Sequence, residues 1–396
     1  MPTKKILIIF GTRPEAIKLA PLINEIKNTP SLNGIVCVFR QHEEMLNQVL
    51  RVFKITPDYD LKITLNDKAL FGKNINIFKK AMSLINTGFS LIKFLRILKT
   101  EKPDLLIIQG DTSTAFLAAF LGFHFKIPIA HIEAGLRTYN KYSPFPEEMN
   151  RQLISRLADL HFTPTERDAD NLLKEGISKS NIILTGNTAI DSLLFVRNRQ
   201  SEENMRENYV KIFKDKYKID LKTNKKIILL TAHRRESFGE GLRNIFSAIK
   251  EIVKRREDVV IIYPVHPNPN VQHLAREMLK DSPNIYLINP VEYDEFIFLM
   301  GISYFILTDS GGIQEEAPSL GKPVLVMREN TERQEGVEAG TSKLVGTSSE
   351  KIINETLNLL DDKNTYNAMI KDQNPYGDGK AAKRIIEAIS NFKNQS

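Results

Sequence analysis

Three carboxylates in the first half of the sequence follow apolar, strand-like segments and could do acid–base chemistry together. Asp111 comes directly after Leu105-Leu-Ile-Ile-Gln-Gly110, and Glu133 follows Ile127-Pro-Ile-Ala130. Glu147 lies farther along, where a helical pattern begins. Open α/β sheets bind ligands at the carboxyl ends of their strands, so we expect these side chains to lie at one edge of a sheet. Carboxylates in such a place can exchange protons with a substrate.

The same stretch allows a simpler interpretation. Arg137 and Arg151 lie close in the sequence to Glu133 and Glu147, so the charges could merely pair within a loop. However, a polar connection of this length, following a buried strand, resembles a site more than a simple connector. Spacing alone leaves both interpretations open.

The composition is that of a soluble globular protein that contains more than one domain. The chain has 396 residues, of which 42% are hydrophobic and 26% are charged. The net charge of +7 (55 basic minus 48 acidic residues) is spread along the chain and suits an anionic small molecule at least as well as nucleic acid. No nucleic-acid motif is present. The single cysteine, Cys37, is expected in the core and fits a reducing cytoplasm.

The predicted elements are strands that alternate with helices, which is typical of βαβ units around a parallel sheet. The first series of strands comprises Lys5–Phe10, Ile35–Phe39, Leu105–Ile108, Pro128–His131, Leu160–Phe162 and Ile182–Leu184. A helical linker, Arg197–Lys225, precedes the second series, which comprises Ile227–Leu230, Val259–Val265, Ile285–Ile288, Phe305–Thr308 and Pro323–Met327.

Two such series predict an α/β protein with two Rossmann-like domains and an active site in the cleft between them. We expect one domain at residues 1–190 and the other at 191–376, with the final helix in 377–396 packing back onto the first. The apolar segment Phe78–Leu98 is interrupted by lysine and arginine, so it predicts a buried amphipathic helix instead of a membrane span. We therefore expect a cytoplasmic protein without a membrane or nucleic-acid partner.

The loop after the first strand predicts a phosphate contact. Gly11-Thr-Arg-Pro-Glu15 allows a tight turn, and Pro14 suits the first position of the following helix. Arg13 and Lys18 would lie near a helix N-terminus, which already favours anions. The alternative is an arginine that faces solvent. The loop lacks the GxGxxG pattern, so we expect no dinucleotide.

The sequence Thr308-Asp-Ser-Gly-Gly-Ile-Gln-Glu-Glu316 gives the strongest single signal. A strand, a Ser-Gly-Gly turn and a helix start together predict backbone N–H groups arranged for a phosphate. Glu316, one helical turn later, could accept hydrogen bonds from a ribose diol. Arg328-Glu-Asn-Thr-Glu-Arg333 adds cations after the next strand. The alternative is an ordinary strand-to-helix turn.

A third basic loop follows the first strand of the second series. His233, Arg234 and Arg235 could bind a diphosphate there, although a basic surface loop is the alternative. Pro264-Val-His-Pro267 is a similar but weaker pattern. The histidines are scattered, and Asp58-Tyr-Asp60 is interpreted as a turn, so we expect no metal site.

In this order, the motifs resemble the bacterial, non-hydrolysing UDP-N-acetylglucosamine 2-epimerases over almost the whole chain. The matching positions are Gly11-Thr-Arg-Pro-Glu15, Gln41-His42, Gly110-Asp-Thr112, Glu133-Ala-Gly-Leu-Arg-Thr138, Pro146-Glu-Glu148, Thr185-Gly-Asn-Thr188, His233-Arg-Arg-Glu236, Ser310-Gly-Gly312 and Arg333. The resemblance implies a GT-B-type fold, UDP-N-acetylglucosamine as substrate and a supply of surface-polysaccharide precursors. It also implies a homodimer and no cofactor.

The resemblance also implies roles for particular residues. Asp111, Glu133 and Glu147 would be the acid–base set, with His233 also catalytic and Lys18 close by. The residues that hold UDP would be Arg13, His233, Phe296, Ser310, Gly311, Gly312, Glu316 and Arg333. Gln41, Arg234 and His266 would correspond to a regulatory second site, although Phe39-Arg40 departs from the small residues that relatives usually have before Gln41.

The implied reaction is a reversible change of configuration at C2. UDP would leave C1 while C2 loses its proton, which gives a glycal, and both would then add back. A hydrolysing epimerase that releases UDP and free N-acetylmannosamine is the nearest alternative. A UDP-sugar glycosyltransferase and a sugar-nucleotide sensor are the others.

Overall fold

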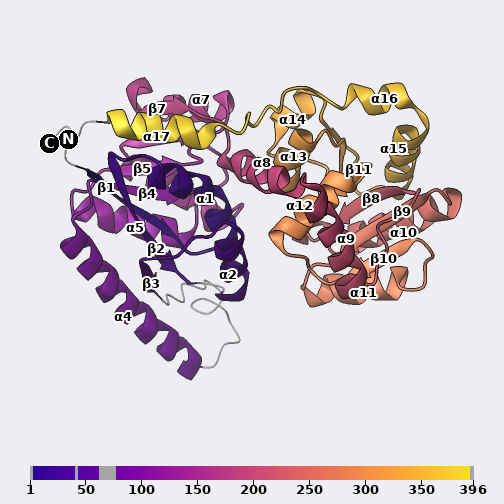
Figure 1. Cartoon of the computed structure of the whole chain (residues 1–396), viewed down its shortest axis with the longest axis horizontal. Coiled ribbons are helices and arrows are strands. Elements are labelled where there is room, and N and C mark those ends of the chain that lie inside the picture. Colours follow the sequence, from indigo (N-terminus) through magenta and orange to yellow (C-terminus); the bar gives the residue numbers. More distant parts are fainter. Residues whose placement is uncertain (1–2, 41–42, 62–76, 393–396) are drawn as a thin grey trace. The chain divides into compact units, whose positions relative to one another are not determined.

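The structure, a computed structural model, describes residues 3–40, 43–61 and 77–392. The chain divides into two compact units, each built around its own sheet (Figure 1). Unit 1 contains residues 1–192 and 379–396, and unit 2 contains residues 193–378. Both sheets are parallel and are flanked by helices, which confirms the predicted α/β class with two Rossmann-like halves.

The sheet of unit 1 has seven strands in the order β3-β2-β1-β4-β5-β6-β7. These are β1 (Lys4–Phe10), β2 (Leu32–Phe39), β3 (Tyr59–Leu61), β4 (Leu105–Gln109), β5 (Ile129–Ile132), β6 (Leu160–Thr163) and β7 (Ile182–Leu184). The central strands are almost entirely buried, as expected where helices cover both faces of a sheet. The strand order changes direction between β1 and β4, so this is the topological switch point.

The helices of unit 1 surround this sheet. They are α1 (Arg13–Lys27), α2 (Glu43–Val52), α4 (Ile77–Glu101), α5 (Ser113–His124), α6 (Glu147–Leu157), α7 (Glu166–Lys174), the start of α8 (Thr188–Gln200), and α17 (Ala381–Asn391). Although α17 comes last in the sequence, it lies against unit 1 (Figure 1). The carboxylate of Asp191 accepts hydrogen bonds from the backbone N–H groups of Ala381 and Ala382 at its first turn.

The core of unit 1 joins the sheet to α4. The ring of Phe39 meets that of Phe94 edge-on, with centroids 5.0 Å apart. Phe94 and Leu98 are buried, whereas Lys93, Arg96 and Lys99 are exposed. The described part of α4 is therefore amphipathic, as predicted. Cys37 is buried in β2, as predicted, and burial raises the pKa of its thiol.

Unit 2 has a sheet of six strands in the order β10-β9-β8-β11-β12-β13. These are β8 (Lys226–Thr231), β9 (Val259–Pro264), β10 (Ile285–Ile288), β11 (Phe305–Thr308), β12 (Val324–Val326) and β13 (Ser342–Leu344). Here the switch point lies between β8 and β11. The strands that His233 and Ser310 follow are therefore neighbours at this point.

The helices of unit 2 include one strongly amphipathic example. They are α9 (Glu203–Tyr217), α10 (Glu240–Arg255), α11 (Pro269–Leu279), α12 (Tyr293–Ile302), α13 (Gly311–Glu316), α14 (Gln334–Glu338), α15 (Ser349–Asp361) and α16 (Lys363–Ala368). In α10, Leu242, Ile245, Ile249 and Ile252 recur at helical spacing and are buried. This face packs into the core of unit 2.

Two strands were not predicted, and both lie at sheet edges. The interpretation of Asp58-Tyr-Asp60 as a turn is wrong, because Tyr59–Leu61 forms β3 beside β2. The carboxylate of Asp58 accepts a hydrogen bond from the backbone of Val36 and so helps to fix the register. Both β3 and β13 are short and carry polar residues, so neither shows a strand pattern in the sequence.

Candidate active site

A buried glutamate fixes the loop after β1. Glu15 is 1% exposed, and its carboxylate accepts hydrogen bonds from the backbone N–H groups of Gly11 (3.0 Å) and Thr12 (2.7 Å). It also accepts one from the hydroxyl of Thr112 (2.7 Å), in the loop after β4. Burial raises the pKa of Glu15, although these hydrogen bonds oppose the rise. Glu15 thus ties together the two loops at the switch point, where half-buried Arg13 begins α1.

Glu133 lies just after β5, where it contacts three other side chains of unit 1. Lys18 Nζ is 2.5 Å from Glu133 Oε1, and both side chains are mostly buried. Gln109 Nε2 donates to Oε2, and Asn187 Nδ2 donates to Oε1 at 3.3 Å. The backbone of Glu133 has a φ of 62°, in the left-handed region that residues other than glycine rarely adopt.

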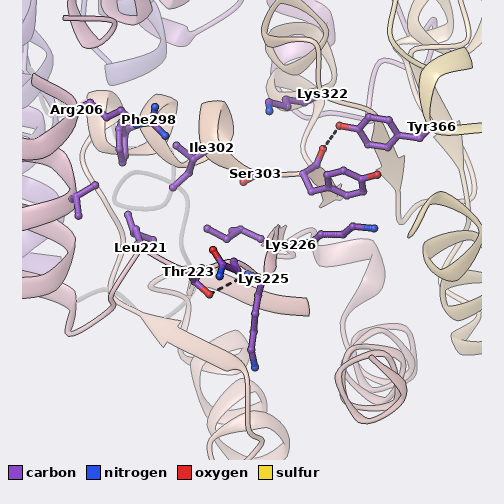
Figure 2. A pocket seen from close by; sticks show the side chains of 14 residues that line it. Arg206, Leu221, Thr223, Lys225, Lys226, Phe298, Ile302, Ser303, Lys322 and Tyr366 are labelled. Atoms are coloured by element: carbon purple, nitrogen blue, oxygen red, sulfur yellow. Dashed lines mark hydrogen bonds between the residues drawn. The ribbon is translucent and has the colours of Figure 1, made fainter. Parts of the chain in front are cut away.

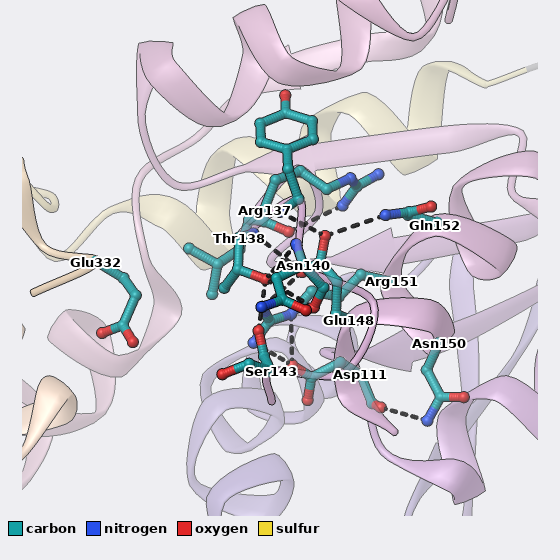
Figure 3. Close-up of polar contacts among 12 residues, drawn as sticks. Asp111, Arg137, Thr138, Asn140, Ser143, Glu148, Asn150, Arg151, Gln152 and Glu332 are labelled. Carbon is teal, nitrogen blue, oxygen red and sulfur yellow. Dashed lines mark hydrogen bonds and ion pairs between the residues drawn. The ribbon is translucent and has the colours of Figure 1, made fainter. Parts of the chain in front are cut away.

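Asp111, in the loop after β4, is held by helix α6 (Figure 3). Its Oδ2 accepts a hydrogen bond from Arg151 Nε at 2.7 Å. Its backbone carbonyl accepts another from Asn150 Nδ2 at 2.8 Å. Because β4 and β5 are paired neighbours, the loops that carry Asp111 and Glu133 leave the same edge of the sheet.

Glu147 and Glu148 begin α6 and have different surroundings. Glu147 is half-buried, and its Oε2 is buried without a hydrogen-bond partner among the residues that the structure describes. Glu148 is fully buried and accepts hydrogen bonds from the backbone of Thr138 (3.0 Å) and Tyr139 (3.1 Å) (Figure 3). Burial opposes ionisation of Glu148, but these bonds and the charge of Arg151 outweigh it and lower its pKa.

The ion pairs differ from the simple loop pairing that the sequence allowed. Arg137 is buried and makes two hydrogen bonds to the carboxylate of Glu175, at 2.7 and 2.9 Å. Arg151 contacts Asp111 and Glu148. Arg137 therefore holds the loop in place, while the cation beside Glu133 is Lys18.

Two buried histidines lie in neighbouring strands of this sheet, His131 in β5 and His161 in β6. His131 Nε2 donates to the carbonyl of Gly110 at 2.7 Å, and its ring is 1% exposed. Burial and the neighbouring His161 lower the pKa of His131 to about 3, and burial lowers that of His161 to about 4. Both rings are therefore neutral at pH 7 and support the site without charge.

In unit 2, the backbone N–H groups of the Ser-Gly-Gly turn lie beside Arg333. Ser310 is the N-cap of α13, so the N–H groups that follow it have no partners within the helix. A Cβ atom at Gly312 would meet no atom within 4 Å, whereas one at Gly311 would lie 3.1 Å from Cζ of Arg333. Arg333 Nε donates to Glu315 at 2.8 Å. Glu316 is half-buried at the end of the helix.

A buried aspartate joins the Ser-Gly-Gly turn to the basic loop after β8. Asp309 is fully buried, and its Oδ2 accepts hydrogen bonds from the backbone N–H groups of His233 (2.6 Å) and Arg234 (2.7 Å). The rings of His233 and His266 are stacked with centroids 4.9 Å apart. Burial and His233 lower the pKa of His266. Asp309 thus sets the conformation of the loop that carries His233.

Arg328 is neutralised inside unit 2. It is 6% exposed, and it donates to Glu236 at 2.5 Å and to Glu332 at 2.9 Å. Burial opposes ionisation of Glu332, but Arg328 outweighs it and lowers the pKa of Glu332 to about 2. Both cations expected after β12 are therefore paired with carboxylates, and of the two Arg333 is the one beside the Ser-Gly-Gly turn.

The remaining predicted positions are less closely defined. Phe296 is half-buried in the first turn of α12. Gln41 and His42 lie outside the described residues, so the regulatory site expected from Gln41, Arg234 and His266 stays a prediction. Within the ranges the structure covers, no group of three or more histidine, cysteine, aspartate or glutamate residues could hold a metal ion. No helix in those ranges is long and apolar enough to span a membrane.

Several supporting residues lie within motifs noted in the sequence, but their contacts were not predicted. Asp309 and Glu148 act through backbone N–H groups, and neither contact has a sequence pattern. Gln109 and Asn187 meet Glu133 only through the fold. Glu15 had a usable signal, because Thr12 and Glu15 have capping-box spacing, and the structure contains that capping box.

Comparison with known proteins identifies a family for this chain. The family model described as UDP-N-acetylglucosamine 2-epimerase matches residues 24–390. The chain is 50% identical over 392 residues to the UDP-N-acetylglucosamine 2-epimerase of Campylobacter jejuni, covering 99% of this chain and 98% of the relative. It is 47% identical over 393 residues to that of Escherichia coli K12, covering 98% of each.

Solved structures agree with this result. The UDP-GlcNAc 2-epimerase of Neisseria meningitidis, bound to UDP-GlcNAc, is similar with a TM-score of 0.85 and 43% identity, covering 98% of this chain and all of the other. The enzyme of Methanocaldococcus jannaschii in complex with UDP-GlcNAc and UDP gives a TM-score of 0.76 and 32% identity, with the same coverage. The chain therefore belongs to the UDP-N-acetylglucosamine 2-epimerase family.

Proposed function

We propose that the protein interconverts UDP-N-acetylglucosamine and UDP-N-acetylmannosamine without releasing free sugar. The observation that carries this proposal is the pair of supported carboxylates at the switch-point edge of unit 1. Glu133 lies against Lys18, and Asp111 lies against Arg151. A sensor that only binds a sugar nucleotide would not require two carboxylates fixed in this way. Nor would a glycosyltransferase that passes the sugar to an acceptor.

The chemistry follows from the substrate. No carbonyl group acidifies C2 of an N-acetylhexosamine, so direct removal of its proton would give an unstabilised carbanion. Elimination avoids this difficulty. The bond from C1 to the diphosphate oxygen breaks as the C2 proton leaves, giving UDP and a glycal. Return of a proton to the opposite face of C2 and of UDP to C1 completes the epimerisation.

In this mechanism Asp111, Glu133 and Glu147 exchange the C2 proton. Lys18 stabilises negative charge on Glu133, because opposite charges at hydrogen-bond distance attract strongly in a partly buried site. Arg151 holds the Asp111 carboxylate in a fixed orientation. Glu147 has a buried oxygen without a hydrogen-bond partner among the described residues, and a substrate hydroxyl would supply one.

The departing UDP needs its own stabilisation. Backbone N–H groups after Ser310 and the guanidinium of Arg333 would bind the diphosphate, with Arg13 and His233 as further donors. Glu316 would bind the ribose, and Phe296 would contact the uracil. In support, Arg333 lies beside Gly311, and space is open above Gly312.

A time course of proton NMR with UDP-N-acetylglucosamine tests the proposal. We expect a manno-configured UDP-sugar that approaches a fixed ratio with the substrate, while free N-acetylmannosamine stays at background. Stoichiometric release of UDP and free N-acetylmannosamine would establish the hydrolysing alternative. UDP release only in the presence of a sugar acceptor would establish a glycosyltransferase.

We also infer that the protein acts as a cytoplasmic homodimer. In support, α5 exposes Phe120 (43%) and Phe123 (56%), and contiguous exposed aromatic surface often marks an interface. Sedimentation equilibrium should give twice the chain mass, and Phe123→Ser should shift the equilibrium toward the monomer. A wild-type protein that stays monomeric at micromolar concentration would refute the dimer.

A further inference from the structure

A pocket of about 380 Å³ lies at the amino-terminal edge of the sheet in unit 2 (Figure 2). Lys226 begins β8 there, Tyr304 immediately precedes β11, and Lys322 precedes β12. The Ser310 turn and the His233 loop lie at the opposite, carboxyl edge. Strands rise about 3.3 Å per residue, so the six residues of β8 put the two edges roughly 20 Å apart.

The pocket is lined by four cations and by no carboxylate. Arg206, Lys225, Lys226 and Lys322 are among its described lining residues, none of which is aspartate or glutamate. Lys225 Nζ donates to the amide oxygen of Asn284, and Lys226 Nζ donates to a backbone carbonyl, both at 2.9 Å. These partners are neutral, so the positive charge is left without a counter-charge from the lining.

Lys322 is the clearest example of a positive charge in this pocket without a counter-charge. It is half-buried, and within the described ranges its ammonium makes no hydrogen bond or ion pair. Burial and the nearby charge of Arg197 lower the pKa of Lys322. A buried cation without an anionic partner is unfavourable, and a bound anion would remove that cost.

The walls of the pocket are ordered and partly apolar. The rings of Tyr304 and Tyr366 are stacked with centroids 4.3 Å apart, and the Tyr366 hydroxyl donates to the carbonyl of Tyr304 (Figure 2). Lys226 Nζ lies 4.6 Å above the ring of Tyr304. Leu221 and Phe298 provide apolar surface opposite these groups. Such a combination of cations with apolar walls suits a small organic anion better than a bare halide.

We propose that this pocket is a second anion-binding site, which takes a small phosphorylated molecule at the edge of unit 2 opposite the UDP residues. The cations come from α9, from the start of β8 and from the segment before β12, so a ligand with two or more negative charges would bridge elements distant in sequence. It would also contact the beginnings of strands whose ends carry the His233 and Ser310 loops.

Titration of the full-length protein with ribose 5-phosphate and with pyrophosphate tests the proposal. Saturating UDP is kept present, so that the proposed catalytic diphosphate site is already filled. We expect one site that still binds under these conditions, with an affinity that falls as salt is added. Arg206→Gln and Lys322→Gln should each weaken binding about tenfold or more, because each removes a charged donor. Lys351→Gln, an exposed lysine on α15, is the matched control and should bind normally.

The outcomes separate the possibilities. Tighter binding of ribose 5-phosphate than of pyrophosphate identifies an organic phosphate as the ligand class, and the reverse order identifies a bare diphosphate. Binding that disappears when UDP is present, or that is equally strong in all three variants, would overturn the proposal. Because Arg206 is exposed, its variant folds normally, and UDP affinity measured in the same samples shows whether unit 2 remains intact.

Discussion

Asp309 holds the backbone of His233, and its carboxylate lies beside the His233 ring. Asp309 Oδ2 accepts the backbone N–H of His233 at 2.6 Å, and Oδ1 lies 3.3 Å from the ring Nδ1. The aspartate follows β11 and the histidine follows β8, so one buried carboxylate fixes the loop of the neighbouring strand at the switch point.

Removing this carboxylate should damage both stability and UDP binding. Asp309→Ala leaves two partly buried backbone N–H groups without their acceptor, which should lower the free energy of unfolding by about 1–3 kcal/mol. Asp309→Asn keeps an acceptor oxygen and should lose less. Urea denaturation and UDP titration measure the two effects. Asp281→Ala, at an exposed position of unit 2, is the control, and equal behaviour of the two alanine variants would contradict the assigned role.

The pair formed by Lys18 and Glu133 should matter for turnover more than for UDP affinity. Glu133→Gln keeps the shape of the side chain but removes its charge and its basicity. We expect kcat to fall by about 10²–10⁴-fold, the range typical of general acid–base groups, while UDP affinity changes little. Lys18→Met should also lower kcat, because Glu133 loses its counter-charge. A Glu133→Gln enzyme with wild-type kcat would remove Glu133 from the acid–base set.

The stability of unit 1 should fall in mild acid. The folded-state pKa values of His131 and His161 are about 3 and 4, below the unfolded value near 6.5. Between these limits the unfolded chain binds more protons, so each histidine lowers the free energy of unfolding as the pH decreases from about 6.5, by at most about 1.4 kcal/mol per pH unit. Above pH 6.5 this effect is absent.

Urea denaturation at a series of pH values measures this dependence. His161→Gln should make the loss of stability between pH 6.5 and 4 shallower. His273→Gln is the control, because the side chain of His273 is 87% exposed, and it should follow the wild type. If the pH dependence of His161→Gln is unchanged, His161 is not the group that titrates.

The two glycines after Ser310 should respond differently to alanine. At Gly311 the added Cβ would come within 3.1 Å of Arg333, so Gly311→Ala should displace that guanidinium and weaken UDP binding. At Gly312 the Cβ meets no protein atom, so Gly312→Ala should fold as stably as the wild type. A lower UDP affinity in Gly312→Ala would then report close approach of the ligand itself. Normal UDP affinity in both variants would show that the diphosphate does not bind at this turn.

Much of the fold could be predicted because its strands are buried on both faces. Phe305–Thr308, for example, is buried along its whole length and was predicted with the observed bounds, since continuous apolar runs between turn residues are distinctive. The edge strands β3 and β13 could not be predicted, because each has only three residues and includes polar ones, whereas the edge strands β7 and β10 are apolar and were predicted. The strands β3 and β13 are extended because they pair with a neighbouring strand, β2 or β12, and their own sequences show no strand pattern.

For the site, the type and position of a residue indicated where it would lie, but its interaction partners could not be predicted. Asp111 and Glu133 could be expected at one sheet edge because each follows a buried strand. That Lys18 would meet Glu133, 115 residues away, depends on how α1 packs against β1 and β4, and no local pattern encodes it. The simpler pairing of Glu133 with Arg137 failed for the same reason, because Arg137 turns inward to Glu175.

The most direct test of the proposed chemistry is the origin of the hydrogen at C2. In D₂O, UDP-N-acetylglucosamine is incubated with the enzyme, and both sugar nucleotides are analysed by NMR. A carboxylic acid exchanges its proton rapidly with solvent, so we expect deuterium at C2 of the UDP-N-acetylmannosamine formed. Asp111→Asn should form this product at least about 10²-fold more slowly while still binding UDP. Product that retains protium at C2 would contradict the proposed acid–base mechanism, because it would require the same hydrogen to return without exchange or a route that leaves the C2 proton in place.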